Sequence, residues 1–366
     1  MTKKRILLTG GGSGGHVVPL VAVAEELKRL AGDRIKIFYI GPREKLNEEF
    51  ENREIKVYRI AGAKWRRYFD PRNLIDIPKF FISFFQALFR IYFIMPDVVF
   101  SKGGTGALPV VLAARFYFIP VMIHDSDSVP GLVSRISSRF AKKIFISFKT
   151  AASYFPKKEV ELVGNPIRTE IIVNRPPNTE VAKTRIRLKP EEPLVVFLGG
   201  SQGAAAINDF VFNNFEKLVS FAQIFHQVGT TSLNEAERLQ NLNERYRYGG
   251  FIDAEQMKAV LAAADVVVSR AGSAAIFEIA SFGKPAILIP LPEGAGNHQK
   301  INAYEYERSG AAIVIEQSNL SLGIIKLEIE KILNNPAVRE NMSQAARGFS
   351  KPEAAEVIAK RILEFT

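Results

Sequence analysis

The chain has 366 residues, 47% of them hydrophobic, which is enough for two α/β domains that each bury a core. It has no cysteine, which excludes disulfides, thiolate metal sites and a cysteine nucleophile. The net charge of +11 comes from the first half alone: residues 1–165 hold 27 Lys and Arg against 15 Asp and Glu, whereas residues 166–366 hold 22 against 23. We therefore expect the first half to meet an anionic partner, which could be nucleic acid, a phosphorylated substrate or anionic lipid.

The start of the chain superficially resembles a signal peptide, because basic residues precede an apolar run. That run breaks at Gly10, well short of the ~7–15 residues of a signal core, so it predicts a first β-strand over residues 5–9. Apolar runs of strand length, followed by glycine turns and helical patterns, recur at residues 35–40, 97–101, 120–123, 194–198, 265–269 and 285–290. This alternation predicts parallel, doubly wound sheets.

Two features predict a division into two similar domains. Six prolines between residues 156 and 193 interrupt the alternation and mark a boundary region. Residues 97–104 and 265–272 repeat the same order of strand, glycine turn and helix start. Any βαβ unit tends toward this order, but the nearly equal spacing favours two Rossmann-like domains with a ligand site between them.

The first glycine-rich turn, residues 10–15, has the G-x-G-x-x-G spacing of a dinucleotide site. Such a site needs an acidic residue at the end of the second strand, where this chain has Gly41, so NAD is the weaker interpretation. Backbone N–H groups at a helix start still suit an anion or a closely approaching sugar. Two later turns, residues 199–203 and 270–273, also follow strands and could hold a diphosphate without a metal ion.

Seven stretches, by their order and spacing, resemble the MurG family of glycosyltransferases across essentially the whole chain: residues 11–16, 124–127, 164–168, 199–203, 251–253, 270–278 and 297–299. The resemblance implies an α/β fold of GT-B architecture, with two Rossmann-like domains whose parallel sheets face each other across a cleft. Residues 1–163 would form the acceptor-binding and membrane-docking domain, with a C-terminal helix over about 350–366 packed back on it. Residues 164–349 would bind UDP-GlcNAc.

The activity implied is an inverting transfer of GlcNAc from UDP-GlcNAc to undecaprenyl-pyrophosphoryl-MurNAc-pentapeptide (lipid I), which forms lipid II in peptidoglycan biosynthesis. The resemblance also implies that no cofactor is required and that the enzyme is peripheral on the cytoplasmic face of the bacterial inner membrane. Proteins of cell-wall synthesis and division are candidate partners. The alternatives are another UDP-sugar enzyme, such as a glycolipid synthase or a UDP-GlcNAc epimerase, and a nonenzymatic nucleotide-sugar or NAD-binding protein. Residues 270–278 with Gln299 favour a UDP-sugar, and Gly41 argues against NAD.

The substrate contacts of the family carry over to matching residues of this chain. Arg168 and Ser201 would face the donor, and the Arg168 guanidinium would offer forked hydrogen-bond donors to phosphate. A helix start would present its amides to the diphosphate, at Ser273, Ala274, Ala275, Ile276 and Phe277. The other contacts expected are Glu278 with the ribose hydroxyls, Ile252 with uracil through its backbone, Gln299 with the GlcNAc hydroxyls, and Ser13, Gly14 and Gly15 with the sugar from the first domain.

An inverting transfer needs a base that removes the proton from the acceptor hydroxyl while the leaving UDP is stabilised. His16, directly after the first glycine turn, is the leading candidate because imidazole titrates near neutral pH. Asp127 is the alternative base, and an equal alternative for His16 is that it binds substrate or shapes its loop. We expect His124 to orient its own loop and His226 to be structural.

Residues 125–127 have the D-x-D form that binds a divalent metal in other glycosyltransferases. Here the motif matches the acceptor-domain loop rather than the donor domain, so we predict that no metal is required. Asp127 stands where some relatives have Asn, and His298 where some have Gln. Either difference would alter hydrogen bonding to the sugar.

Residues 64–69 mix cations with aromatic side chains and include the single tryptophan, Trp65. The apolar residues 79–95 are interrupted by Gln86 and Arg90 and are shorter than the ~20 residues of a membrane-spanning helix. This composition predicts an interfacial surface that docks the first domain on anionic lipid, with residues 115–118 as a further candidate. The alternative is one buried helix face made of Phe81, Phe84, Phe85, Leu88 and Phe89. The chain has no recognised nucleic-acid-binding module, which disfavours nucleic acid as the partner.

Overall fold

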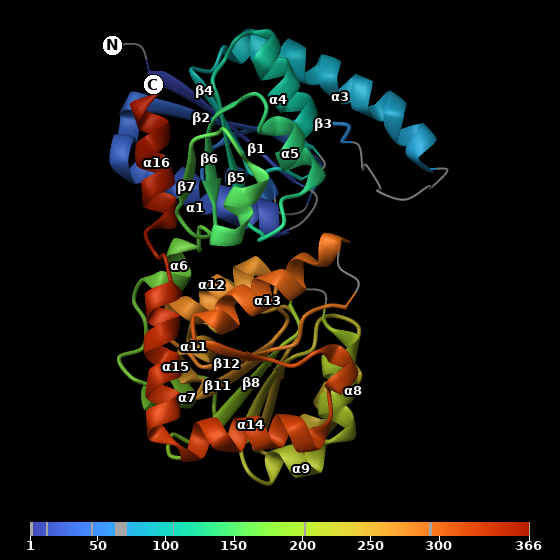
Figure 1. Ribbon diagram of the computed structural model, residues 1–366, viewed down its shortest axis with the longest axis vertical. Helices are drawn as coiled ribbons and strands as arrows, with labels where there is room; N and C mark the ends of the chain where they lie inside the picture. Colours follow the sequence, from blue (N-terminus) through green and yellow to red (C-terminus); the bar gives the residue numbers. More distant parts are fainter. Residues whose placement is uncertain are drawn as a thin grey trace. The chain divides into compact units, whose positions relative to one another are not determined.

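The computed structural model describes residues 3–11, 14–44, 47–62, 72–104, 106–200, 203–292 and 295–365. The chain divides into two compact units, the first made of Met1–Arg168 together with Lys351–Thr366 and the second of Thr169–Ser350 (Figure 1). The first unit extends beyond residue 163, where the sequence predicted a boundary, because the following residues are bonded to it. The Gly164 carbonyl oxygen accepts a hydrogen bond from His124 Nε2 (2.8 Å), and Asn165 Oδ1 accepts one from Ser126 Oγ (3.1 Å).

The first unit is built on a seven-stranded sheet in the order β3-β2-β1-β4-β5-β6-β7, in which every neighbouring pair is parallel. Its strands are β1 (Lys4–Thr9), β2 (Ile35–Pro42), β3 (Lys56–Ile60), β4 (Val98–Ser101), β5 (Val121–Asp125), β6 (Ala141–Ile146) and β7 (Val160–Leu162). Side chains of β1 alternate between two core clusters, with Ile6 and Leu8 in one and Leu7 in the other. Both faces of the sheet are therefore buried, which explains the continuous apolar runs in the sequence.

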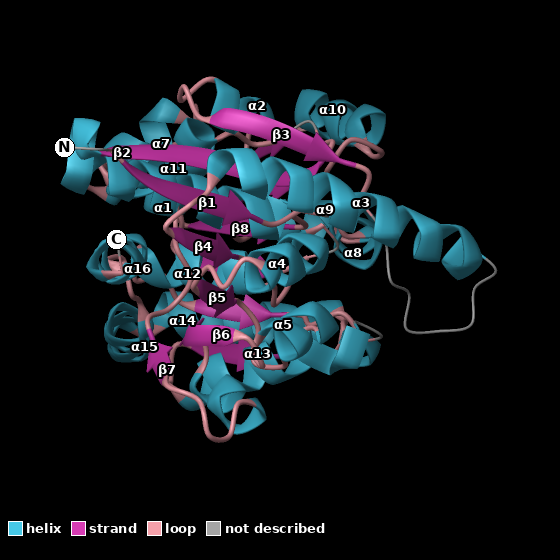
Figure 2. Cartoon of the chain, turned by 90° about the horizontal axis from the view of Figure 1, so that it is seen from above, coloured by secondary structure: helices cyan, strands magenta, loops and turns pink. Residues whose placement is uncertain are grey.

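Helices cover both faces of this sheet (Figure 2). On one face, α1 (Gly14–Ala31) packs with α16 (Ala354–Glu364), the closing helix of the chain, which contributes Ile358 and Ile362 to the core. On the other face lie α3 (Arg72–Ile94) and α4 (Ala107–Phe116). The remaining helical segments are α2 (Glu48–Glu51), α5 (Leu132–Ser137), and the 3-10 turns η1 (Gly32–Arg34) and η3 (Lys149–Tyr154).

The second unit repeats this plan with a six-stranded parallel sheet in the order β10-β9-β8-β11-β12-β13. Its strands are β8 (Leu194–Leu198), β9 (Gln223–Gln227), β10 (Tyr246–Gly249), β11 (Val266–Ser269), β12 (Ala286–Leu288) and β13 (Ala312–Val314). Its helical segments are α6 (Thr169–Ile172), α7 (Thr179–Arg185), α8 (Ala205–Asn213), α9 (Phe215–Val219), α10 (Leu233–Leu242), α11 (Ala254–Ala263), α12 (Ser273–Ser281), η4 (Ala295–Asn297), α13 (His298–Arg308), η5 (Gln317–Asn319), α14 (Leu322–Asn334) and α15 (Pro336–Phe349).

The two sheets confirm the predicted pair of Rossmann-like domains. In each sheet the strand order reverses beside its first strand, between β1 and β4 and between β8 and β11. Residues 97–104 and 265–272 occupy equivalent places, since they span β4 and β11 with the turns that follow. In open α/β sheets, ligands bind outside the carboxyl ends of the strands at such a reversal. A ligand is therefore expected at the turns after β1, β4, β8 and β11.

Candidate active site

Two glycine turns meet at the strand-order reversal of the first sheet. The turn after β1 contains Gly11, whose φ is 141°, and the turn after β4 contains Gly104, whose φ is 82°. A Cβ atom on Gly104 would lie 1.8 Å from the Gly11 carbonyl oxygen, so this approach requires glycine. The Lys102 backbone N–H also donates to the Thr9 carbonyl oxygen at 2.9 Å. The two turns are therefore packed directly against each other at the carboxyl ends of β1 and β4.

His16 lies in the first turn of α1, just beyond the first glycine turn. Burial, followed by the charge of Lys102, lowers the pKa of His16 to about 4, and the charge of Asp127 opposes this shift. The imidazole is therefore neutral at neutral pH, the form that can accept a proton. Gly14 and Gly15, the predicted sugar contacts, begin the same helix. Ser13 lies outside the described residues.

Asp127 belongs to the turn after β5, and its backbone N–H donates to Asp125 Oδ1 at 3.1 Å. Within this turn, Ser126 Oγ accepts a hydrogen bond from Lys102 Nζ and donates to Asn165 Oδ1. Burial raises the pKa of the Asp125 carboxyl group. The part of the chain that the structure describes contains no group of three or more His, Asp or Glu side chains placed to hold a metal ion.

His124 anchors the base of this turn. It is fully buried in β5, and its Nε2 donates to the Gly164 carbonyl oxygen. Burial, followed by the charge of Lys102, lowers the pKa of His124 well below its usual value, so the ring is neutral. His124 therefore links β5 to the segment after β7, and its predicted role in orienting its own loop stays a prediction.

Lys102 is the residue of this cluster that the sequence analysis missed. Its sequence signal is the repeat of residues 97–104 in 265–272, in which Lys102 is the counterpart of Arg270. The Arg270 guanidinium donates to the Ile289 carbonyl oxygen (3.1 Å) and to Gln317 Oε1 (2.7 Å), so it braces its own unit. Lys102, in contrast, lies among His16 and Asp127, the two candidate bases.

In the second unit, α12 begins directly after β11, at the strand-order reversal. Ser273 Oγ is buried there and has no hydrogen-bond partner among the described residues. The first turn of α12 contains no acidic residue to offset its N–H groups. Ala274 and Ala275 are half-buried, whereas the side chains of Ile276 and Phe277 belong to the core. The helix start therefore combines backbone amides, one unpaired hydroxyl and small side chains, which suits an anion.

The other predicted donor residues of the second unit lie on neighbouring elements. Glu278 is half-buried on α12, four residues after Ala274 and so on the same helix face. Gln299 lies in the first turn of α13, where its Oε1 accepts from the Leu291 backbone N–H at 3.2 Å. Ile252 is buried just before α11, which leaves its backbone as the group that could meet a base.

Two predicted donor contacts, Ser201 and Arg168, are not among the described residues of the second unit. Ser201 lies outside the described residues, and the nearest described residues on either side, Gly200 and Gly203, have φ of 78° and 77°. Arg168 is the last residue of the leading segment of the first unit, so it belongs to the unit that contains His16. Gly14, Gly15, His16, Asp127 and Arg168 thus belong to the first unit, and Ile252, Ser273 to Glu278 and Gln299 belong to the second.

An apolar surface lies on α3 and at the end of α4. Exposed aromatic side chains gather on this helix and at the end of α4: Phe81, Phe85, Phe89, Tyr92, Phe93, Phe116 and Phe118. Phe85 is 64% exposed and Phe89 is 60% exposed, so the alternative of one buried face is wrong for these residues. A hollow of about 590 Å³ between them is also lined by Arg59 and Arg90. Residues 64–69 lie outside the described residues.

The sequence prediction underestimated the length of α3. It has 23 residues, and its Asp76–Ile94 segment, with a mean hydropathy of 1.4, is long and apolar enough to cross a membrane by length and composition. Its other face, however, is attached to the first unit through the buried Ala87 and Ile91. Ser83 Oγ also accepts from the Gly62 backbone N–H at 3.0 Å. This attachment fits a helix that lies along the unit with one apolar face outward.

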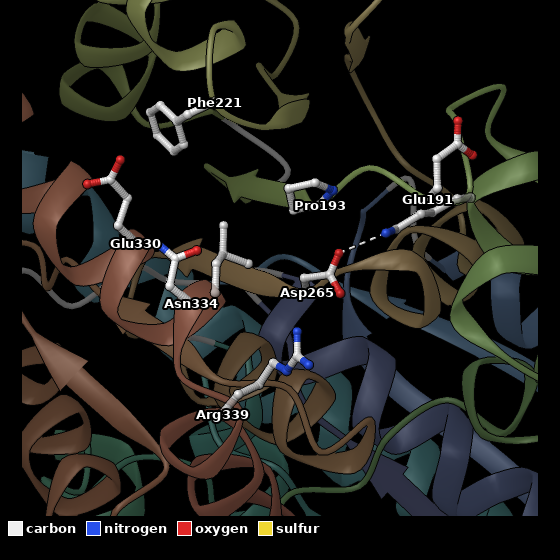
Figure 3. A pocket seen from close by; sticks show the side chains of 9 residues that line it. Glu191, Pro193, Phe221, Asp265, Glu330, Asn334 and Arg339 are labelled. Carbon is white, nitrogen blue, oxygen red and sulfur yellow. Dashed lines mark ion pairs between the residues drawn. The ribbon is translucent and has the colours of Figure 1, made fainter.

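A second hollow, of about 330 Å³, lies at the amino ends of β8 and β11, the edge of the sheet opposite to the glycine turns (Figure 3). Its buried Lys183 is paired with Asp265 at 2.9 Å and donates to the Glu192 carbonyl oxygen at 2.6 Å. Arg339, Glu191 and Glu330 line the remainder, so charges of both signs surround it. Its position separates it from the candidate active site.

Two family models match the chain: the glycosyltransferase family 28 N-terminal domain over residues 6–146 and the glycosyltransferase family 28 C-terminal domain over residues 194–361. A curated relative from Bacillus thuringiensis (strain Al Hakam), UDP-N-acetylglucosamine--N-acetylmuramyl-(pentapeptide) pyrophosphoryl-undecaprenol N-acetylglucosamine transferase 3, is 37% identical over 363 residues, 99% of each chain. A transferase of this kind from Caldicellulosiruptor saccharolyticus is 36% identical over 98% of this chain and 97% of its own length.

The fold of the chain is also similar to that of solved structures. The crystal structure of Acinetobacter baumannii MurG has a TM-score of 0.76 and 26% identity, and the match covers 99% of each chain. The S. aureus MnaA-UDP co-structure has a TM-score of 0.71 and covers 99% of this chain and 98% of its own. Its 15% identity makes it a likeness of fold alone.

Proposed function

Because the chain belongs to glycosyltransferase family 28, and within it to the UDP-N-acetylglucosamine–N-acetylmuramyl-(pentapeptide) pyrophosphoryl-undecaprenol N-acetylglucosamine transferases, we propose that it transfers GlcNAc from UDP-GlcNAc to lipid I. The product is lipid II, a precursor of peptidoglycan. The observation that carries this proposal is the start of α12, where an unpaired buried hydroxyl and uncompensated amides follow β11 at the strand-order reversal.

The donor lies along α12 in this proposal. Its diphosphate receives hydrogen bonds from the amides at Ser273 to Phe277 and from Ser273 Oγ, and the helix dipole favours its charge. Glu278 accepts hydrogen bonds from the ribose hydroxyls. Five residues separate Ser273 from Glu278, which corresponds to ~7.5 Å along a helix, a reasonable span from a phosphate to a ribose. The small side chains of Ala274 and Ala275 leave this path open.

The other donor groups extend the same arrangement. The backbone at Ile252 meets uracil, and Gln299 reads the GlcNAc hydroxyls through its amide, whose NH₂ group is a donor. Arg168 and Ser201 complete the donor contacts, and the guanidinium of Arg168 stabilises the charge that develops on the leaving diphosphate. Ser13, Gly14 and Gly15 approach the sugar through backbone groups at the start of α1.

The chemical step is a single in-line displacement. The acceptor hydroxyl oxygen forms a bond to the anomeric carbon as the bond from that carbon to the UDP oxygen breaks, and the configuration inverts. The proton of the hydroxyl passes to His16, which is neutral and therefore able to accept it. Asp127 is the alternative acceptor of this proton. UDP leaves as an anion held at the start of α12.

The first unit also docks on the anionic surface of the cytoplasmic side of the inner membrane, as a peripheral protein. The support is the outward face of α3, on which exposed phenylalanines lie beside Arg59 and Arg90. Apolar side chains enter the headgroup boundary, and cations meet the phosphates of anionic lipids. Such a position would bring the enzyme to an acceptor that is itself anchored in the membrane.

A transfer assay tests the function directly. The protein is incubated with UDP-GlcNAc labelled in the sugar and a short-chain lipid I analogue, and the product is examined by mass spectrometry and NMR. We expect one GlcNAc added per acceptor, with the β configuration, since an inverting enzyme starts from an α-linked donor. A labelled product with retained configuration, or no labelled product, would contradict the proposal.

A further inference from the structure

Arg175 holds the carboxyl-terminal end of α12, the helix that carries Glu278. Its Nη1 donates to the Ser281 carbonyl oxygen at 2.7 Å, and its Nη2 donates to Ser281 Oγ at 3.3 Å. The central carbon of its guanidinium group also lies 4.0 Å from the centre of the Phe282 ring. Two hydrogen bonds and a cation–π contact therefore attach this half-buried side chain to the last residue of α12 and to the residue that follows it.

The carbonyl groups of the last turn of α12 depend on this attachment. The last four carbonyl groups of a helix have no partner within the helix itself. Here the Ile279 and Ala280 oxygens accept from backbone N–H groups just beyond the helix. The Glu278 oxygen accepts from Ser281 Oγ at 2.8 Å, and the Ser281 oxygen accepts from Arg175. Two of the four carbonyl groups therefore rely on side chains, and Arg175 bonds to Ser281 at both places.

Glu278 is the residue that this arrangement fixes. The hydrogen bonds run from Arg175 Nη2 to Ser281 Oγ and from there to the Glu278 carbonyl oxygen. Glu278 begins the last turn of α12, and helix ends fray when their carbonyl groups lose their partners. The position of the Glu278 carboxylate, the proposed acceptor for the ribose hydroxyls, therefore depends on Ser281 and Arg175.

The charge of Arg175 also suits the place where it lies. The last turn of α12 contains no basic residue of its own, and its first turn contains no acidic residue. A helix has partial negative charge at its carboxyl end and partial positive charge at its amino end. Arg175 therefore supplies a cation at one end of the nine-residue helix, whose other end is the proposed site of the diphosphate.

The backbone that presents Arg175 is itself anchored in the second unit. Lys258 Nζ, on the neighbouring helix α11, donates to the Val173 carbonyl oxygen at 3.3 Å. Ile171 of α6 is fully buried, and Pro176, which follows Arg175, is also buried. The guanidinium group therefore reaches α12 from a fixed segment of the chain.

We propose that Arg175 is a positioning residue for the donor: it holds Ser281 through two hydrogen bonds, fixes the last turn of α12, and so places the Glu278 carboxylate for the ribose hydroxyls. The inference rests on the proposed function, which assigns those hydroxyls to Glu278. It means that the preference for an intact ribose depends on a side chain from the segment that follows α6.

Binding of UDP, 2′-deoxy-UDP and 3′-deoxy-UDP tests the inference without any acceptor, by titration calorimetry. The wild type should bind UDP at least about tenfold more tightly than the weaker deoxy analogue, which lacks a hydroxyl that donates to the carboxylate. Arg175→Met removes both hydrogen bonds and the charge, so this preference should fall below about threefold. A wild-type preference in folded Arg175→Met would overturn the inference.

Arg245→Met is the matched control. Arg245 is also half-buried in the second unit, and its Nη1 donates to the Val219 carbonyl oxygen at 2.5 Å, at the end of α9. Because α9 carries no proposed donor contact, Arg245→Met should keep the wild-type preference for UDP. If it loses that preference as fully as Arg175→Met does, the effect comes from general loosening of the unit, and the inference is wrong.

Ser281→Ala tests the path between the two residues. It keeps the charge of Arg175 and its bond to the carbonyl oxygen, but it removes the hydroxyl that joins Arg175 to Glu278. The preference for UDP over the weaker deoxy analogue should fall at least about threefold. An unchanged preference in Ser281→Ala would overturn the inference, and this variant decides the matter if Arg175→Met does not fold.

The outcomes separate this inference from the proposed function. A wild type that prefers UDP as expected but transfers no GlcNAc contradicts the function, and the binding measurements still report on Arg175. A wild type that binds UDP and both deoxy analogues equally contradicts the ribose assignment of Glu278 and the inference together. A wild-type preference that Arg175→Met retains contradicts the inference alone.

Discussion

Arg361 of α16 forms an ion pair with Glu161 of the edge strand β7, with 3.2 Å between Arg361 Nε and the Glu161 carboxylate. The two residues stand 200 positions apart, and the segment between them contains the whole second unit. The helix that carries Arg361 also buries Ile358 and Ile362 in the first core. The first unit is therefore closed by residues that follow the second unit in the chain.

Replacing Ile358 with alanine should lower the free energy of unfolding of the first unit by about 2–5 kcal/mol, because it leaves a cavity under α16. Hydrogen exchange of the β1 amides in increasing guanidinium reports on this unit. The control is Ile325→Ala, an equally buried residue in the core of the second unit. If Ile358→Ala leaves the exchange of the β1 amides unchanged, α16 does not stabilise the first unit.

Glu278→Ala should weaken the binding of UDP and UDP-GlcNAc alike by ~1–3 kcal/mol, because both ligands lose an acceptor for the ribose hydroxyls. Titration calorimetry measures the two affinities, and circular dichroism checks that the variant is folded. Glu237→Ala, which removes an exposed carboxylate from α10 of the same unit, serves as the control. An unchanged UDP affinity in folded Glu278→Ala would show that Glu278 does not bind the ribose hydroxyls.

Chelation should leave the transfer rate unchanged. The charge of the diphosphate is met by the amides at the start of α12 and by Arg168, so no divalent ion is needed. The measurement compares turnover in excess EDTA with turnover in added Mg²⁺ or Mn²⁺. A rate that disappears in EDTA and returns with the metal would instead assign Asp125 and Asp127 to a metal site.

Membrane docking should depend on the outward face of α3. Replacing Phe85 and Phe89 with serine should weaken binding to anionic vesicles, since each phenylalanine contributes about 1.5–3 kcal/mol when fully buried. Leu242 and Leu327 of the second unit are 65% and 63% exposed, so their double serine variant is a matched control. Sedimentation with vesicles measures binding, and equal binding by the two variants would exclude α3 as the docking surface.

The predicted role of charge in docking is tested by replacing Lys64, Arg66 and Arg67, which lie outside the described residues, with glutamine. Each cation near an anionic membrane contributes about 1 kcal/mol, so the triple variant should bind vesicles less well, most clearly at low salt, where screening is weakest. Transfer to a short-chain soluble acceptor should change little. If the triple variant binds anionic vesicles as well as the parent, the basic residues of the first half bind another anion. The pyrophosphate of the acceptor is then the first candidate.

Apolar periodicity predicted the central strands well, because β1 and β8 are buried on both sides and read as continuous apolar runs. It did not signal β9 or β10, whose sequences contain Gln, His and Arg. The buried His226 is tolerated in β9 because its ring nitrogens bond Tyr246 Oη (3.0 Å) and Asn208 Oδ1 (3.1 Å), an arrangement that confirms its structural role but that a sequence cannot display.

The candidate site, like the strands, could be predicted from the sequence only in part. Glycine turns and the residues matched to the family identified the ends of β1, β8 and β11 from the sequence. Lys102 was missed, because one lysine after an apolar run looks like a solvated turn until the fold buries it beside Ser126. The length of α3 was also underestimated, because Asp76 and Pro78 precede the apolar run yet lie within the helix.

The measurement that tests the central claim most directly follows UDP-GlcNAc by NMR with and without a lipid I analogue. We predict that UDP appears in a one-to-one ratio with the GlcNAc-bearing acceptor, and that the donor is stable when the acceptor is left out. Conversion of UDP-GlcNAc to its C2 epimer without acceptor, or release of UDP that does not depend on the lipid I analogue, would contradict the account.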